Sequence, residues 1–244
     1  MSQAPQIVNS IAPLRNVGLL MGQIKVLTGR MEGEPGLGCF YGPSGYGKSF
    51  AKIFVANHHR AYHVQCDDTW TRKVLCHEIL LVMGIAPAGT IPDMVKQIAE
   101  QLTLSGRPLI IDEADFLVKK SLIEAIRAIY ERSLTPIILI GEAGLPAALE
   151  RWERVYSRVL TWTQAEPATI ADASQLAKVY CRDLEIASDL LAALFEKCNG
   201  SARRIVSGLS SIRQQALILG VKKIAAADFK GEFFPFDRTD RRAK

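Results

Sequence analysis

The sequence predicts an α/β fold with a five-stranded parallel sheet, followed by a small helical domain. From about residue 16 to 165, short apolar runs alternate with stretches of helical periodicity, which is typical of a parallel sheet covered by helices. After Gln164 no further strand-like run follows and the periodicity is helical. We therefore expect an α/β domain with an N-terminal helix over residues 1–165, and a helical domain with a basic tail over 166–244.

Strands are expected where short apolar runs have apolar or β-branched centres, as buried strands do. These runs are Leu37–Tyr41, Ala61–Gln65, Pro108–Asp112, Pro136–Gly141 and Val159–Thr163. Helices of the first domain are expected at Asn16–Thr28, Ser49–Asn57, Thr69–Met83, Ile91–Leu104, Leu117–Ser133 and Leu145–Val155. Those of the second are expected at Asp172–Leu184, Ser188–Lys197, Ala202–Leu219 and Ala225–Phe229.

Composition sets limits on the kind of protein. The five cysteines are an odd number without C-x-x-C spacing, which argues against a disulfide framework or a zinc site. No leader-like start and no membrane-length apolar run is visible, so we expect a soluble protein of the cytoplasm without a membrane partner. The net charge of +5 permits nucleic-acid partners without requiring them. The basic tail (Arg238, Arg241, Arg242 and Lys244) is either a mobile solvated end or a DNA contact.

A glycine-rich loop follows the first expected strand and precedes a helix. It has the complete G-x-x-x-x-G-K-S pattern of a phosphate-binding loop, whose backbone N–H groups and helix N-terminus hold phosphates. Lys48 would reach the β- and γ-phosphates of ATP, and Ser49 would coordinate Mg²⁺. The expected nucleotide-binding residues are Gly42, Pro43, Ser44, Gly45, Tyr46, Gly47, Lys48, Ser49 and Phe50.

Acidic residues end two later strands. Asp112 and Glu113 follow an apolar strand about 60 residues after the loop, as expected for a carboxylate that supports Mg²⁺ and a general base that polarises the attacking water. Glu142 ends the strand from Pro136 to Gly141. It would either act through a hydrogen bond to a neighbour near the γ-phosphate or cap the helix that follows Gly144.

Arginines stand at two places where they could meet phosphate. Arg151, Arg154 and Arg158 precede the last strand, and in a ring or filament an arginine there reaches the γ-phosphate of a neighbouring subunit. Arg158 is favoured over Arg154, and Arg151 comes third; the alternative is a solvated helix face paired with glutamates. Arg203 is expected on the first turn of a helix in the second domain, and Arg204 on its surface.

Together these motifs resemble the AAA+ ATPases over nearly the whole chain, from about Asn16 to Asp228. The resemblance rests on the Gly42–Ser49 loop, the strand ending in Asp112 and Glu113, Arg158 after Ser157, and Gly200 to Arg203. It implies a P-loop NTPase with a five-stranded parallel sheet and a C-terminal helical lid. It further implies that Arg158 is an arginine finger and Arg203 a sensor in the lid.

Within that class, Asn16 and Val17 ahead of the loop, Glu142 after its strand, and the Gly-Ser-Ala-Arg-Arg lid resemble the phage Mu B transposition protein group. TniB-, TnsC- and ExeA-type ATPases are similar in pattern. The resemblance implies an ATPase that assembles as a ring, spiral or filament on double-stranded DNA without sequence specificity and stimulates a transposase, in a bacterial host. Asn16 would then contribute to the nucleotide site.

Two departures from that group bear on the mode of action. Mu B carries an additional N-terminal DNA-binding region for which we expect no room here, and its first-sensor position, usually neutral and polar, is Glu142 in this chain. DNA contact is therefore expected from basic pairs on the core domain, which track phosphates, or those pairs are solvated faces. The candidates are Arg72, Lys73, Lys119 and Lys120.

Three other functions fit parts of the pattern. A helicase or replication loader would prefer single strands and a helicase partner. An ExeA-type secretion ATPase would be attached to a membrane- or wall-binding segment, and none is visible. A small-molecule kinase would have no use for arginines at positions 158 and 203.

Overall fold

The computed structural model describes residues 14–234, so the basic tail from Arg238 to Lys244 lies outside the described residues. The chain folds as two compact units. Residues 16–44 and 48–165 form an α/β unit, and residues 166–234 form the core of a second, mainly helical unit. Each is described by itself below.

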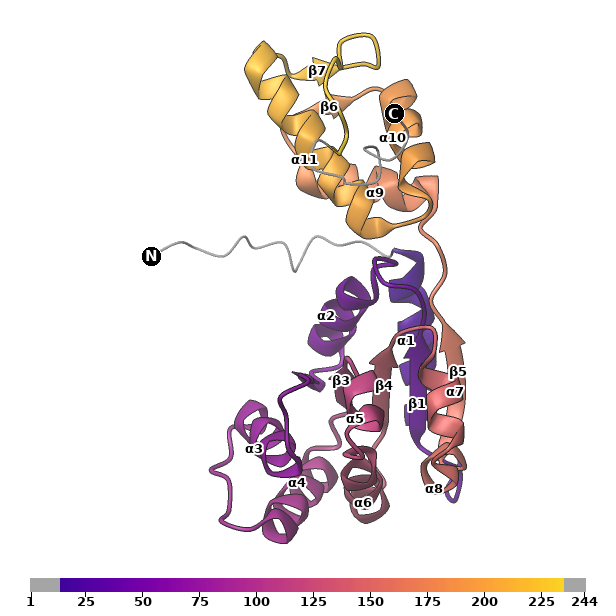
Figure 1. Cartoon of the computed structure of the whole chain (residues 1–244), viewed down its shortest axis with the longest axis vertical. Helices are drawn as coiled ribbons and strands as arrows, with labels where there is room; N and C mark the ends of the chain where they lie inside the picture. The colour runs from indigo at the N-terminus through magenta and orange to yellow at the C-terminus, as the bar shows by residue number, and fades with distance from the viewer. Residues whose placement is uncertain (1–13, 235–244) are drawn as a thin grey trace. The chain divides into compact units, whose positions relative to one another are not determined.

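A five-stranded parallel sheet is the centre of the α/β unit, as predicted (Figure 1). The strands are β1 (Leu37–Tyr41), β2 (Tyr62–Gln65), β3 (Leu109–Asp112), β4 (Ile137–Gly141) and β5 (Val159–Gln164). Their order is β2-β3-β4-β1-β5, and Leu37 of the inner strand β1 lies opposite Ile137 on one side and Val159 on the other. The carboxyl ends of all five strands therefore meet at one edge of the sheet.

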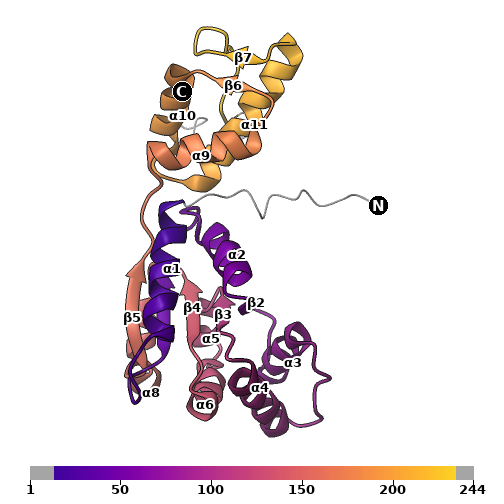
Figure 2. The same ribbon diagram turned by 180° about the vertical axis from the view of Figure 1, so that it is seen from behind.

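Helices cover both faces of this sheet. They are α1 (Arg15–Thr28), α2 (Lys48–His58), α3 (Arg72–Met83), α4 (Ile91–Ser105), α5 (Asp115–Lys119), α6 (Ile123–Ser133), α7 (Leu145–Glu150) and α8 (Glu153–Tyr156). The side chain of Gln23 on α1 donates to the Cys39 carbonyl and to Thr161, which places α1 over β1 and β5 (Figure 2). The other face packs in one apolar core with residues of α3 to α8, to which β1 contributes Leu37 and Cys39.

Local sequence explains where the covering helices begin and end. The hydroxyl of Thr71 caps α3 by accepting from the Val74 N–H at 3.3 Å, and Thr90 caps α4 in the same way. Gly84 and Gly106 end these helices in the left-handed conformation that glycine adopts without strain. Capping threonines and terminal glycines therefore define both ends of α3 and α4.

Two predicted helices are in fact divided. The single helix expected over residues 117–133 is wrong, because Ser121 has a positive φ of 57° that separates α5 from α6. The helix expected over residues 145–155 is likewise interrupted at Trp152, which has non-helical angles and separates α7 from α8. Neither break involves an internal glycine or proline, so composition offered no signal for it.

The second unit holds three long helices, α9 (Ile170–Tyr180), α10 (Ser188–Cys198) and α11 (Ala202–Leu219). The expectation that it is all-helical is wrong, because β6 (Glu185–Ile186) pairs in parallel with β7 (Lys223–Ile224). The helix expected over residues 225–229 is a single turn. The sequence did not predict these strands, because two residues are too few to show an alternation of apolar and polar residues. In the structure Ile224 is fully buried and Lys223 pairs with Glu185.

The cysteines and the membrane expectation can be checked within the described residues. Cys39, Cys66, Cys76, Cys181 and Cys198 are all buried free thiols. In residues 14–234 no helix combines the length and the apolar character needed to cross a bilayer.

Candidate nucleotide site

The glycine-rich loop joins the end of β1 to the first turn of α2. Gly45 and Gly47 both have φ of +87°, a conformation that residues with a Cβ rarely adopt, so this loop depends on glycine there. Lys48 is the first residue of α2, and its Nζ donates to the carbonyl oxygens of Gly42 (2.6 Å) and Pro43 (3.0 Å). Ser49 is exposed on the same turn, and Phe50 is half-buried. The loop can therefore direct backbone N–H groups, an ammonium and a hydroxyl toward phosphates.

The predicted carboxylates lie at the end of β3, on the same edge of the sheet. Asp112 is the last residue of β3 and is 5% exposed, while Glu113 follows in a left-handed conformation with φ of 55°. A glutamate in that region carries backbone strain, which is typical of functional sites. Burial raises the pKa of Glu113, and the charges of Asp112 and Asp115 add to the effect. A raised pKa makes the Glu113 carboxylate a stronger proton acceptor, as a general base requires.

The electrostatics of Lys48 link the loop to these carboxylates. Burial lowers the pKa of Lys48, and the nearby charges of Glu113, Asp112, Glu142 and Asp115 oppose that shift. The structure therefore brings the side chains predicted for phosphate, metal and base near one another at the carboxyl ends of β1 and β3. No group of three or more His, Cys, Asp and Glu side chains in residues 14–234 is arranged to hold a metal ion.

Glu142 is exposed, and its main-chain N–H rather than its side chain makes the hydrogen bond that fixes it. Its N–H donates to Oδ2 of Asp115 at 2.8 Å. A Cβ on Gly141 would collide with the same carboxylate, so the glycine permits this close approach. The alternative that Glu142 caps the following helix is wrong, because Gly144 is the N-cap of α7 and no side chain caps it.

Lys52 and Asp115 are site residues that the sequence analysis missed. Lys52 is buried on α2, and its Nζ forms an ion pair with Oδ2 of Asp112 at 2.7 Å. It stands four residues after Lys48, and residues with this spacing share one face of a helix. That spacing was the one sequence signal for Lys52. It did not reveal that this face of α2 would meet the end of β3.

Arg158 lies at the opposite edge of the sheet from the loop. Its carbonyl accepts from the N–H of Leu37, the first residue of β1, whereas the loop begins after Tyr41, the last. The five residues of β1 separate Arg158 from the start of the loop by about 16 Å. Within one α/β unit Arg158 therefore lies far from the phosphate loop.

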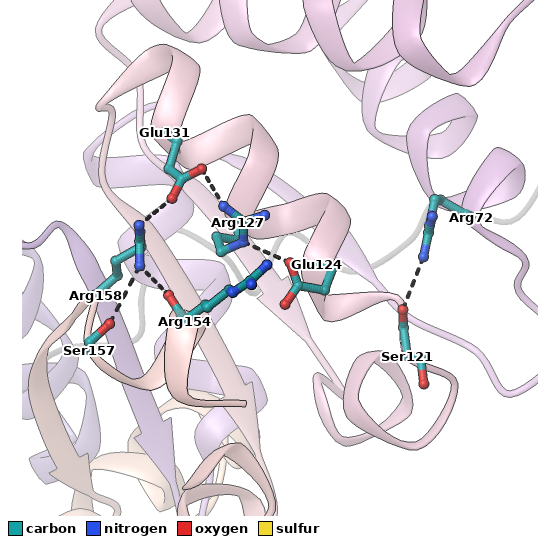
Figure 3. A network of polar contacts seen from close by, with 8 residues as sticks. All are labelled: Arg72, Ser121, Glu124, Arg127, Glu131, Arg154, Ser157 and Arg158. Carbon is teal, nitrogen blue, oxygen red and sulfur yellow. Dashed lines mark hydrogen bonds and ion pairs between the residues drawn. The ribbon is translucent and has the colours of Figure 1, made fainter. Parts of the chain in front are cut away.

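A polar network holds the side chain of Arg158 (Figure 3). One end of its guanidinium pairs with Glu131 of α6, and the other donates to the Arg154 carbonyl and to Ser157. Glu131 also pairs with Arg127, whose Nε lies 2.7 Å from Glu124. The alternative arginines of the sequence analysis, Arg151 and Arg154, are exposed.

The four candidate DNA-contacting residues come from two segments that meet. Arg72 at the start of α3 donates to the Ser121 carbonyl at 3.3 Å, next to Lys119 and Lys120 (Figure 3). Lys73, Lys119 and Lys120 are exposed. Lys119 and Arg151 also line a surface hollow of about 640 Å³. The structure thus gathers these cations on one region of the α/β unit.

The remaining predicted residues lie on α1 and in the helical unit. Asn16 is buried on α1. Arg203 is exposed on the first turn of α11, whose N-cap Ser201 accepts from the Arg204 N–H at 3.3 Å. Arg204 stacks over the ring of Phe234 at 4.2 Å, so it is not simply a solvated surface charge.

Comparisons with known proteins agree with this geometry. Residues 31–149 match the family model described as an AAA domain. No curated protein matches the chain by sequence.

Solved structures match at low identity but over most of the chain. The Aeropyrum pernix ORC1 protein in complex with DNA aligns with a TM-score of 0.65 and 16% identity, over 92% of this chain and 65% of that one. The Aeropyrum pernix ORC2 protein aligns with a TM-score of 0.70 and 14% identity, over 93% and 70%. The Thermotoga maritima RuvB Holliday junction branch migration motor aligns with a TM-score of 0.66 and 16% identity, over 97% and 78%.

The chain thus spans about two thirds of the length of the first of these structures. The matched residues 31–149 include the loop after β1 and the carboxylates at the end of β3. This chain accordingly has the α/β P-loop fold found in AAA+ ATPases, and its residues 31–149 match the model of an AAA domain.

Proposed function

We propose that this protein binds and hydrolyses ATP with Mg²⁺ at the loop between β1 and α2. Lys48 would contact the β- and γ-phosphates, and Ser49 and Asp112 would hold Mg²⁺, which supplies charge stabilisation to the phosphates. Glu113 would orient and deprotonate the attacking water. The raised pKa of Glu113 and its closeness to Lys48 support this role.

We place each ATP at an interface between two copies of the chain. The observation that carries this proposal is the position of Arg158 beside the first residue of β1, at the opposite edge of the sheet from the loop. An arginine there stabilises transition-state charge only on the nucleotide of a neighbouring subunit. Glu142 and Arg203 would respond to the nucleotide from the strand end and from the helical unit. ATP would thus order a ring, spiral or filament.

We further propose that the assembly binds double-stranded DNA without sequence specificity and activates a transposase as its target-selection protein. The cluster of Arg72, Lys73, Lys119 and Lys120 supports phosphate contact, which is sequence-tolerant and salt-dependent. Two structural neighbours are described as a DNA complex and as a branch migration motor. The transposition role itself rests on the sequence resemblance to the Mu B group.

The first experiment is binding to long duplex DNA with and without ATP, followed by electron microscopy of the same mixture. We expect ATP-dependent binding and filaments or spirals on the DNA. Binding to ATP without binding to duplex DNA would contradict the DNA part of the proposal. A preference for single strands would instead favour a helicase loader.

A mixing experiment tests the shared site. Arg158→Ala and Glu113→Gln subunits should each lose hydrolysis, the first by about 10³–10⁵-fold if it is an arginine finger. A mixture should recover activity, because some interfaces then combine an intact Glu113 from one subunit with an intact Arg158 from the other. No recovery in mixtures shown to co-assemble would contradict a site formed by two subunits.

A further inference from the structure

Lys52 and Asp112 form a buried ion pair inside the candidate nucleotide site. We propose that Lys52 is the positioning residue of Asp112, and that its positive charge lets the site accept a nucleotide before Mg²⁺ is bound. This inference rests on the proposed nucleotide binding. It concerns a residue that has no part in the phosphate-loop motif or in the carboxylate pair.

The geometry engages both oxygens of Asp112. Oδ2 accepts from Nζ of Lys52 at 2.7 Å, and Oδ1 accepts from the N–H of Glu113 at 3.0 Å. The ammonium of Lys52 also lies 3.5 Å from Oε1 of Gln65 on the neighbouring strand β2. Charge-assisted hydrogen bonds of this kind fix the orientation of a carboxylate. Asp112 is therefore already oriented by the protein alone.

Two lysines on the same face of α2 have different partners. Lys48 donates to the loop carbonyls of Gly42 and Pro43, where phosphate would lie. Lys52, one turn later, faces Asp112 instead. Because their partners differ, Lys48 is placed to bind the nucleotide directly, and Lys52 is placed to neutralise the carboxylate behind it.

The charge around the site makes that neutralisation necessary. Glu113, Asp115 and Glu142 lie near enough to Lys48 to oppose the lowering of its pKa by burial, and a carboxylate charge so close to the loop repels phosphate. Without Lys52, Asp112 adds one more uncompensated charge to this group. A bound Mg²⁺ supplies positive charge to the same region and offsets the loss, so the effect of removing Lys52 depends on the metal.

The test is the affinity of the full chain for a fluorescent ADP analogue, measured in excess Mg²⁺ and in EDTA. We expect Lys52→Met to weaken binding about tenfold in EDTA but no more than about threefold in Mg²⁺, as for the loss of one charge near a phosphate. Lys52→Arg, which keeps the charge, should restore binding in EDTA. The matched control Lys48→Met should weaken binding in both conditions, because Lys48 is placed against the phosphates themselves.

A double variant guards against a folding effect. In Lys52→Met/Asp112→Asn both charges are absent, so binding in EDTA should return to within about threefold of the wild type. The single variant Asp112→Asn should bind at least as tightly as the wild type in EDTA. Equal losses in EDTA and Mg²⁺ for folded Lys52→Met would overturn the inference, as would a double variant as weak as Lys52→Met. If the wild type binds no nucleotide in either condition, the proposed function itself is wrong.

Discussion

The two edges of the parallel sheet carry ion pairs of opposite character. At the carboxyl edge, Lys52 and Asp112 form a pair in which each side chain is 7% exposed. At the amino edge, Arg158 and Glu131 form a pair in which the side chains are 33% and 34% exposed. The chemistry of the two pairs is similar, but the exposed fraction of their side chains differs several-fold.

Burial decides what each pair can do. Breaking a buried pair leaves an uncompensated charge in a region of low dielectric, so that pair fixes geometry permanently. A solvated pair contributes little to stability because water and salt screen it, so its partners can be exchanged. The carboxyl edge therefore holds its charges in place before a ligand arrives. At the amino edge the exposed pair lets Arg158 exchange Glu131 for another partner, as the proposed role of Arg158 requires.

The largest effect expected at the carboxyl edge tests whether Glu113 is the base. Glu113→Gln should slow ATP hydrolysis by about 10²–10⁴-fold, the usual contribution of a general base, while nucleotide binding persists. The variant should then trap the ATP-bound assembly, which a hydrolysis assay and a nucleotide-binding assay together detect. Hydrolysis at the wild-type rate would show that another group activates the water.

The raised pKa of Glu113 adds a prediction for pH. Its carboxyl is deprotonated only above a pKa that exceeds the ordinary glutamate value, so hydrolysis should rise with pH through that raised value. The sign for stability is opposite, because the folded state binds this proton more tightly than the unfolded state does. The contribution of Glu113 to stability is therefore present at low pH and is lost as pH rises between the two pKa values. A profile of the hydrolysis rate against pH should show this rise on its acid side.

The contrast between the edges also explains what the sequence could predict. The phosphate loop and the carboxylates of β3 are fixed by local patterns, namely glycines, a lysine and a strand ending in acids, so their positions followed from spacing. The parallel sheet followed from apolar runs. Arg158 was identified from its place before the last strand, but nothing in the spacing pointed to Glu131, because it comes from α6.

The missed features share a physical cause. Lys52 meets Asp112 across 60 residues of sequence, and a lysine on a helix is ordinarily solvated. The breaks at Ser121 and Trp152 occur at residues whose type does not announce the non-helical angles that they adopt. The β6–β7 pair is held by one buried isoleucine and one ion pair, too little to leave a periodic signal. Tertiary contacts decide such details.

The next prediction tests the rigidity of the carboxyl edge. Lys52→Met should lower the free energy of unfolding by about 3–5 kcal/mol, because it leaves Asp112 buried and unpaired. Lys52→Met/Asp112→Asn should recover most of that loss, since a neutral pair carries no uncompensated charge. Urea unfolding of the nucleotide-free protein measures both. A loss below about 1 kcal/mol for the single variant would mean that the pair is solvated, and the contrast between the edges would disappear.

The smallest expected effect belongs to the amino edge. Glu131→Gln removes the carboxylate that Arg158 shares with Arg127, and it should change the free energy of unfolding by no more than about 0.2–1 kcal/mol, the usual range for an exposed pair. Hydrolysis should still change measurably, because without Glu131 the side chain of Arg158 takes a different orientation before it meets the neighbouring nucleotide. The readout is the protein concentration at which hydrolysis is half-maximal.

Glu124→Gln is the matched control for that variant, because Glu124 pairs with Arg127 in the same network but has no contact with Arg158 in Figure 3. If Glu131 acts through Arg158, Glu131→Gln shifts the half-maximal concentration and Glu124→Gln does not. Both variants should give the same nucleotide affinity as the wild type, since the loop lies at the other edge. Equal shifts for the two would mean that the network acts through Arg127 and the packing of α6. A large loss of stability in Glu131→Gln would show that the amino edge is as rigid as the carboxyl edge, despite its exposure to water.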